Sequence, residues 1–221
     1  MKKLLALALW VLILLTLFTG TVGAEDEAHL RKVFLTAVFN IEYGDDSSAV
    51  LHRWENPIVI WAGEEMTDRD EKALFDFADQ LDARVANLPP IYWTRKSDEA
   101  NVTIAYVPLD KMQEYSESYV EGNWGFVSFW WNDAQEMVYA QIAIASDVTS
   151  QIERNHLLME ELAGALGLTN DIDSDPDSII HQEWTTTQEL SGMDWALLNL
   201  LYDERLTPGM SWEEVSAALE W

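Results

Sequence analysis

The sequence contains no cysteine, so no disulfide can stabilise the fold and burial of apolar side chains must hold it together. Basic residues are also scarce, since 13 lysines and arginines stand against 39 acidic residues and the formal net charge is −26. Such a charge opposes binding to nucleic acid and to anionic membrane surfaces. After residue 24 no stretch is apolar enough for a membrane span, which needs about 20 residues.

Residues 1–24 have the three parts of an export signal. Two lysines form the positive start, an apolar run follows, and small residues form a cleavage site. The apolar run is short for a membrane anchor, which favours cleavage. The sequence therefore predicts a secreted or periplasmic protein in which residues 25–52 form a helical lead-in and residues 53–221 a single domain.

The spacing of apolar residues divides the rest of the chain into short strands and amphipathic helices. Strands are expected at 57–61, 91–94, 101–107, 125–131 and 137–144, the last two joined by a hairpin turn. Helices are expected at 29–41, 67–85, 150–166 and 194–202, with a short last helix after Ser211. This order predicts an α/β (α+β) fold with a mixed sheet, a central helix and a helical C-terminal part.

The segment 154–184 concentrates the groups that can do chemistry. Its helix presents an apolar face to the core, while Glu160, Glu161 and Gly164 fall on the opposite side. Gly167 ends the helix, because glycine readily adopts the left-handed conformation found after many helices. A run of alternating aspartates follows. The sequence thus predicts that the functional site lies at the end of this helix.

The motif EELAGALGLTND at residues 160–171 resembles the bacterial domain of unknown function family 2927. The resemblance extends from Arg53 to Met210 and includes NVTI at 101–104 and PDSI at 176–179. Exported members of that family resemble metzincin proteases in layout. The resemblance therefore implies a metzincin-like domain over residues 53–221, and it supplies no known activity.

The metzincin pattern HExxHxxGxxH can be laid on this segment with Gly167 at the glycine position. Glu161 then takes the position of the general base that activates a zinc-bound water. The three ligand positions fall on Glu160, Gly164 and Asn170, of which only the glutamate is a good zinc donor. The standard zinc site is therefore not predicted.

An altered ligand set is a second interpretation of the same helix. His156 lies one turn before Glu160, so the two could bind a metal together with Asn170 and Asp171. The more common role of such a histidine is a pair on the helix surface.

The aspartate run gives a third interpretation, because carboxylates at alternate positions are typical of calcium loops. The alternating residues are Asp171, Asp173, Asp175 and Asp177. Proline at 176 stands where an EF-hand has its glycine, so any calcium site would have another geometry. The alternative is a solvated acidic turn.

These observations lead to three functional hypotheses. The first is an acidic exported protein with a degenerate site that acts as a noncatalytic binding or structural module for a peptide or protein partner. The second is a peptidase-like, metal-dependent hydrolase with Glu161 as its base. The third is a calcium-stabilised exoprotein. The eleven tryptophans are spread along the chain, which favours packing over an aromatic ladder for sugars.

Overall fold

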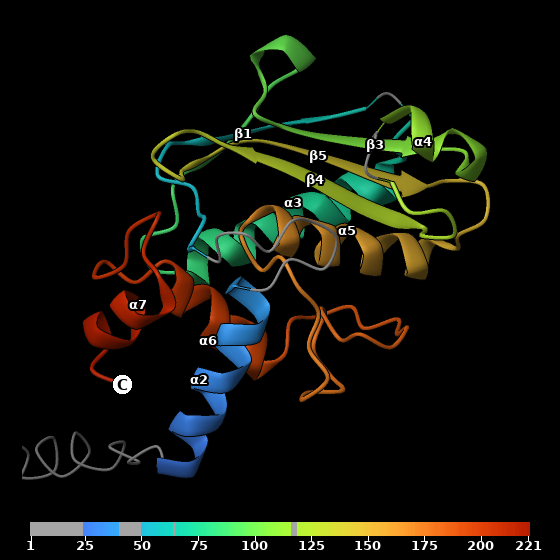
Figure 1. The fold of residues 1–221 in the computed structure, drawn as a ribbon. Coiled ribbons are helices and arrows are strands. Elements are labelled where there is room, and N and C mark those ends of the chain that lie inside the picture. Colours follow the sequence, from blue (N-terminus) through green and yellow to red (C-terminus); the bar gives the residue numbers. More distant parts are fainter. Residues whose placement is uncertain (1–23, 40–49, 64, 116–118) are drawn as a thin grey trace, which may run out of the picture.

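The computed structural model describes residues 24–39, 50–63, 65–115 and 119–221, which form a mixed α/β fold (Figure 1). Residues 1–23 of the predicted export signal lie outside the described residues. A five-stranded sheet has the order β2-β1-β3-β5-β4, with β4 antiparallel to β5 and the other pairs parallel. The strands are β1 (Ile58–Ala62), β2 (Ile91–Trp93), β3 (Val102–Val107), β4 (Gly125–Trp131) and β5 (Met137–Ala145).

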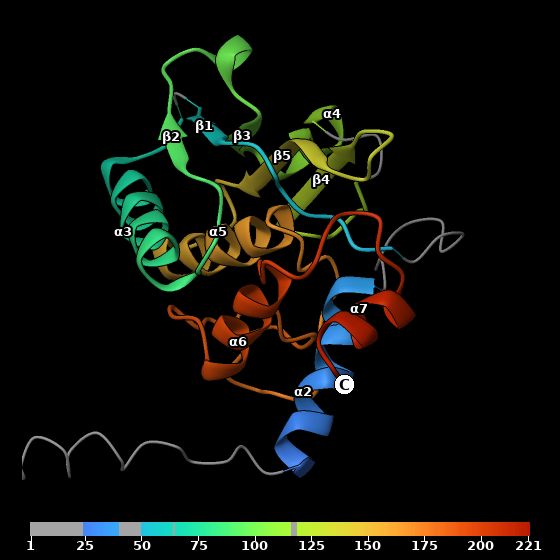
Figure 2. The same cartoon turned by 90° about the vertical axis from the view of Figure 1, so that its left-hand side faces the viewer.

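The helices lie mainly on one side of this sheet. They are α2 (Ala24–Phe39), α3 (Asp68–Arg84), α4 (Met112–Tyr115), α5 (Gln151–Ala165), α6 (Gly192–Leu201) and α7 (Trp212–Ala218). Figure 2 shows α3 and α5 side by side under the sheet, with α6, α2 and α7 below them. The predicted mixed sheet, central helix and helical C-terminal part are confirmed, whereas the likeness to metzincins stays a prediction.

Each of the four helices α3, α5, α6 and α7 begins with a capping box. In each box the cap side chain accepts a bond from the third helical N–H, and the acid at that position accepts one from the cap N–H. The boxes at Thr67, Ser150 and Ser211 were expected from the sequence. The helix predicted from Asp194 instead begins at Gly192, because Ser191 caps it and Asp194 completes the box.

The core lies between the sheet and the helices. It includes Ile58, Ile60, Ile104 and Ile142 from the strands, each 1% exposed or less. Burying a side chain of this size contributes about 1.5–3 kcal/mol. Helix α2 packs into the same core through five buried residues that include Phe34, while the predicted boundary between residues 52 and 53 stays a prediction. Within the described part of the chain, no helix is both long and apolar enough to cross a bilayer.

A buried polar network fixes α5 against α3. Asp70 is 1% exposed, and its Oδ1 accepts hydrogen bonds from Gln151 Nε2 at 2.6 Å and Arg154 Nε at 3.1 Å. Its Oδ2 accepts from Thr67 Oγ1 at 2.6 Å. Because a buried carboxylate is costly unless it is paired, these bonds determine how α5 lies beneath the sheet.

Candidate functional site

A cleft of about 450 Å³ lies between α5, the edge strand β4 and the segment after α5. Helix α5 supplies Glu160, Glu161 and Gly164, and β4 supplies Gly125 and Val127. The remaining wall comes from residues 122–124 and from two stretches of the following loops, 168–171 and 180–184. The cleft therefore occupies the place at which the sequence analysis expected a site.

Two glycines allow α5 to approach the backbone of β4. A Cβ atom added to Gly164 would lie 3.1 Å from Val127 Cγ1, which is tighter than an ordinary contact. A Cβ on Gly125 would overlap the carboxylate of Glu161 and Cδ2 of Leu157. Glu161 thus lies against the first residue of β4. Gly164 lines the cleft but has no side chain, so it offers a metal no donor group.

The candidate ligands are only partly brought together. Glu160, Asn170 and Asp171 line the cleft, whereas His156 is 2% exposed and does not. Among the described residues, no group of three or more His, Cys, Asp or Glu side chains could hold a metal ion. Because the second zinc position is a packed glycine and the third an asparagine, the residues present do not fit a catalytic zinc.

His156 and Glu160 form the i, i+4 pair that their spacing allows, but His156 is buried and not on the helix surface. The Nε2 and Oε2 atoms of the two side chains are 3.5 Å apart. The other ring nitrogen, Nδ1, is 2.9 Å from the carbonyl oxygen of Thr187. Since a carbonyl only accepts, Nδ1 carries a proton and Nε2 faces the glutamate. Burial lowers the pKa of His156, although its bond to Thr187 acts in the opposite direction.

Buried histidines should make the protein sensitive to mild acid. Burial also lowers the pKa of His52, and its bond to Gln135 only partly offsets this. Below a pH of about 6.5 the unfolded chain binds protons that the folded protein does not. The free energy of unfolding should therefore fall as the pH falls from 6.5, by at most about 1.4 kcal/mol per pH unit for each histidine.

Chemical denaturation between neutral pH and pH 5 measures this effect. A variant with His52→Gln and His156→Gln should lose less stability over that range than the wild type. His29→Gln is the matched control, because His29 is exposed on α2. Equal slopes for the double variant and the wild type would exclude the two buried histidines as the source.

The aspartate run is organised by backbone turns and by Asp194. Asp175 Oδ1 accepts a hydrogen bond from the N–H of Asp177 at 3.1 Å, which is a local turn. Asp194 is fully buried and accepts bonds from Ser178 Oγ at 2.5 Å and the N–H of Ile179 at 2.9 Å. These bonds tie the end of the run to α6. Asp173 is exposed, and the calcium site at the four aspartates stays a prediction.

The outer edge of β4 is the feature that sequence reasoning missed. The N–H of Ala145 on β5 donates to the carbonyl of Trp124 at 2.7 Å, so Trp124 and Ala145 are a hydrogen-bonded pair of the antiparallel ladder. Bonding alternates along an antiparallel ladder, and the register therefore turns the backbone groups of Gly125, Val127 and Phe129 away from β5. No described residue makes a backbone hydrogen bond to these three on that side. Two of them line the cleft.

The aromatic part of the cleft was also missed. Trp184 is 53% exposed, and its ring meets that of Trp124 edge-on with centroids 5.5 Å apart. The same ring is nearly perpendicular to that of His156, with ring centroids 5.4 Å apart. Nothing in the spacing of Trp184 distinguishes it from the other tryptophans, because the loop that carries it has no periodicity.

Comparison with known proteins gives one family. A family model described as "Protein of unknown function (DUF2927)" matches residues 27–221, which is most of the chain. This match confirms the resemblance drawn from residues 160–171 and its neighbouring motifs. A comparison with curated proteins gives no match.

Proposed function

We propose that this chain, which belongs to the DUF2927 family, is a noncatalytic binding module that receives an extended peptide segment of a partner protein along β4. The observation that carries the proposal is the outer edge of β4, where the backbone groups of Gly125, Val127 and Phe129 have no backbone partner among the described residues and the first two residues line the cleft. An exposed strand edge offers a row of backbone donors and acceptors to another chain. Peptides commonly bind in this way, with backbone bonds giving affinity and pockets giving selectivity.

The residues that line the cleft indicate the polarity and charge of the partner segment. Leu157, Leu168 and Ile180 give it an apolar floor. The carboxylates at 160, 161 and 171 give it negative charge, in a protein whose net charge is already −26. Charge complementarity favours a segment with lysine or arginine over an acidic one. The exposed ring of Trp184 supplies a surface on which such a cation can lie.

Replacing Val127 by proline tests the binding mode. The N–H of Val127 points away from β5, so proline removes the donor offered to a peptide and leaves the β4–β5 ladder intact. Linear peptides would be selected from a random phage-displayed library on the wild-type protein. Their affinity for Val127→Pro should fall by about tenfold or more, since a buried partner carbonyl is left unpaired. Fluorescence anisotropy of a labelled peptide measures it.

Two further variants make the result specific. Val127→Ala removes the side chain and keeps the N–H, so it should bind nearly as well as the wild type. Ser128→Pro removes a donor that faces β5 and should lower the melting temperature. Peptides that bind Val127→Pro as tightly as Val127→Ala would refute addition to this strand.

A metal-dependent hydrolase is the rival function. It is favoured by the position of Glu161 in the cleft and by the nitrogen of His156 that faces Glu160. Stoichiometric zinc found by elemental analysis, together with chelator-sensitive peptide cleavage that Glu161→Gln abolishes, would establish it against the binding module. We further propose that the protein is exported, which mass measurement of its mature N-terminus tests.

A further inference from the structure

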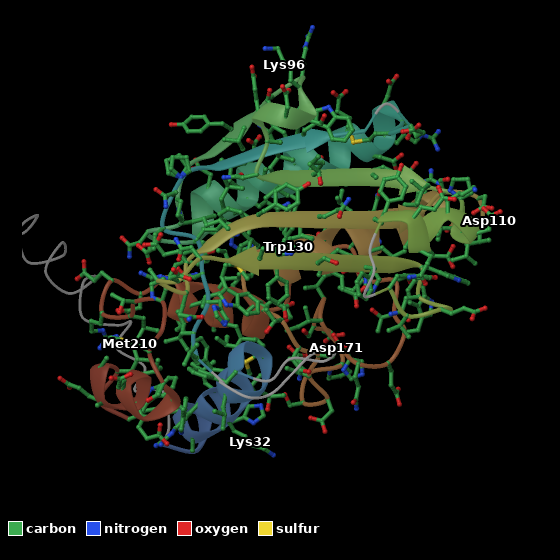
Figure 3. All side chains as sticks on the ribbon, turned by 45° about the horizontal axis from the view of Figure 1, so that its top comes forward. Lys32, Lys96, Asp110, Trp130, Asp171 and Met210 are labelled. Carbon is green, nitrogen blue, oxygen red and sulfur yellow. The ribbon has the colours of Figure 1, made fainter. Side chains whose placement is uncertain are left out.

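The sheet is the uncharged part of a strongly acidic protein. None of the residues in β1 to β5 is acidic or basic, although the net charge of the chain is −26. Helices α3 and α5 cover one face of this sheet, and the short α4 lies over one end of the other face (Figure 1). Figure 3 looks onto that second, open face, where Trp130 lies centrally while Lys96 and Asp110 lie at the margins.

Aromatic side chains form a row across the open face. From one edge of the sheet to the other, the register aligns Tyr92, Val59, Asn101, Tyr139 and Trp130, so Val59 and Asn101 separate Tyr92 from the other two rings. These residues alternate with the buried row that contains Ile60, so their side chains point away from α3 and α5. Tyr92 is 54% exposed and Trp130 is 47% exposed. At about 4.8 Å per strand the row is roughly 19 Å long.

Polar groups without charge stand beside these rings. The next row across the sheet contains Trp61, Thr103, Gln141 and Ser128. Thr103 Oγ1 lies 3.0 Å from the hydroxyl of Tyr139 and fixes its position. The rings of Trp130 and Tyr139 are 5.3 Å apart and inclined at 45°. The face thus combines aromatic surfaces with hydroxyl and amide groups, and Val59 is the aliphatic residue in the exposed row.

We propose that this face, defined by Tyr92, Trp61, Tyr139 and Trp130, binds an uncharged, extended polysaccharide. Pyranose rings present C–H faces that stack on indole and phenol rings, and hydroxyls that pair with amides and hydroxyls. Protein interfaces are also rich in tyrosine and tryptophan, so competition by peptides is the result that distinguishes a protein partner from a glycan. Polyanions are repelled by the surrounding negative charge, whereas a neutral glycan is not.

Calorimetric titration with the neutral hexasaccharides cellohexaose and chitohexaose tests the proposal. The wild type should bind at least one of them, and Trp130→Ala should weaken that binding by about tenfold or more. Tyr92→Ala, at the far end of the row, should also weaken it. Both side chains are about half exposed, so both variants should fold, which thermal melting verifies.

Trp184→Ala is the matched control, because Trp184 is equally exposed but lies in the cleft. It should bind the sugar normally and lose affinity for the selected peptides, whereas Trp130→Ala should do the reverse. Absence of binding to both hexasaccharides overturns the proposal. Binding that Trp130→Ala and Tyr92→Ala leave unchanged, or selected peptides that compete for this face, overturns it as well.

Discussion

Replacing Gly167 by alanine should destabilise the protein by about 3 kcal/mol, which is a large part of the stability of a typical domain. Gly167 has a φ of +116°, a conformation that costs a residue with a side chain about 1–2 kcal/mol. A Cβ there would also lie 2.8 Å from the carbonyl oxygen of His52 and 2.9 Å from Leu201 Cδ2. Because the carbonyl oxygen of His52 belongs to the backbone, it cannot move aside without displacing the segment around His52 that packs against the end of α5.

Two other glycines separate these contributions. Gly122 has a φ of +105° and nothing within 4 Å of an added Cβ, so Gly122→Ala should cost only the conformational term of about 1–2 kcal/mol. Gly192 lies in the first turn of α6 with open space around it, so Gly192→Ala should be neutral or slightly stabilising. Urea denaturation gives all three values. A Gly167→Ala variant that loses no more stability than Gly122→Ala would contradict the close contact with His52.

Replacing Asp70 by alanine should cost about 3 kcal/mol or more, because it leaves the guanidinium of Arg154 without its carboxylate partner. The side chain of Arg154 is only 15% exposed, so water replaces that partner poorly. The variant also loses the acid that completes the capping box of α3. Asp76→Ala is the control on the same helix. Both side chains of its ion pair with Lys72 are exposed, so the unfolding free energy of Asp76→Ala should fall by no more than about 0.5 kcal/mol.

The contribution of Asp70 should depend on pH. Burial alone would raise the pKa of Asp70, but the hydrogen bonds from Thr67, Gln151 and Arg154 outweigh burial and lower it from its ordinary value of 3.8. Stability from such a group is complete above the pKa of the unfolded chain and is lost as the pH falls through the lower folded value. The difference in unfolding free energy between wild type and Asp70→Ala should therefore shrink below a pH of about 4. A difference that stays constant between pH 7 and pH 3 would show that packing, not charge, is lost.

Much of the fold could be predicted because its signals are local. Capping pairs such as Thr67 with Asp70 and Ser150 with Glu153 fix where helices begin, and the apolar runs at β3 and β5 predict buried strands. The sequence also indicated the part of α5 that borders the cleft, since Glu161 and Gly164 break the apolar pattern of that helix. The family was identified from the motif at residues 160–171 together with shorter motifs such as NVTI and PDSI.

The opposite wall of the cleft could not be predicted in the same way. Which strand lies at the edge of a sheet depends on long-range pairing, and the sequence of β4 reads like any buried strand. The tryptophans were interpreted as packing residues, and this interpretation is correct for Trp54, which is 1% exposed. Trp130 and Trp184 are about half exposed, and their exposure could not be predicted because it depends on how distant segments pack.

The most direct test of the account is amide hydrogen exchange with and without a selected peptide. Peptide binding should slow exchange at Val127 and Phe129, whose N–H groups point outward from β4. Exchange at Phe126 and Ser128, which face β5, should change little. Protection confined to another part of the molecule, or protection at none of the outward amides of β4, would contradict the proposal that this edge receives the partner.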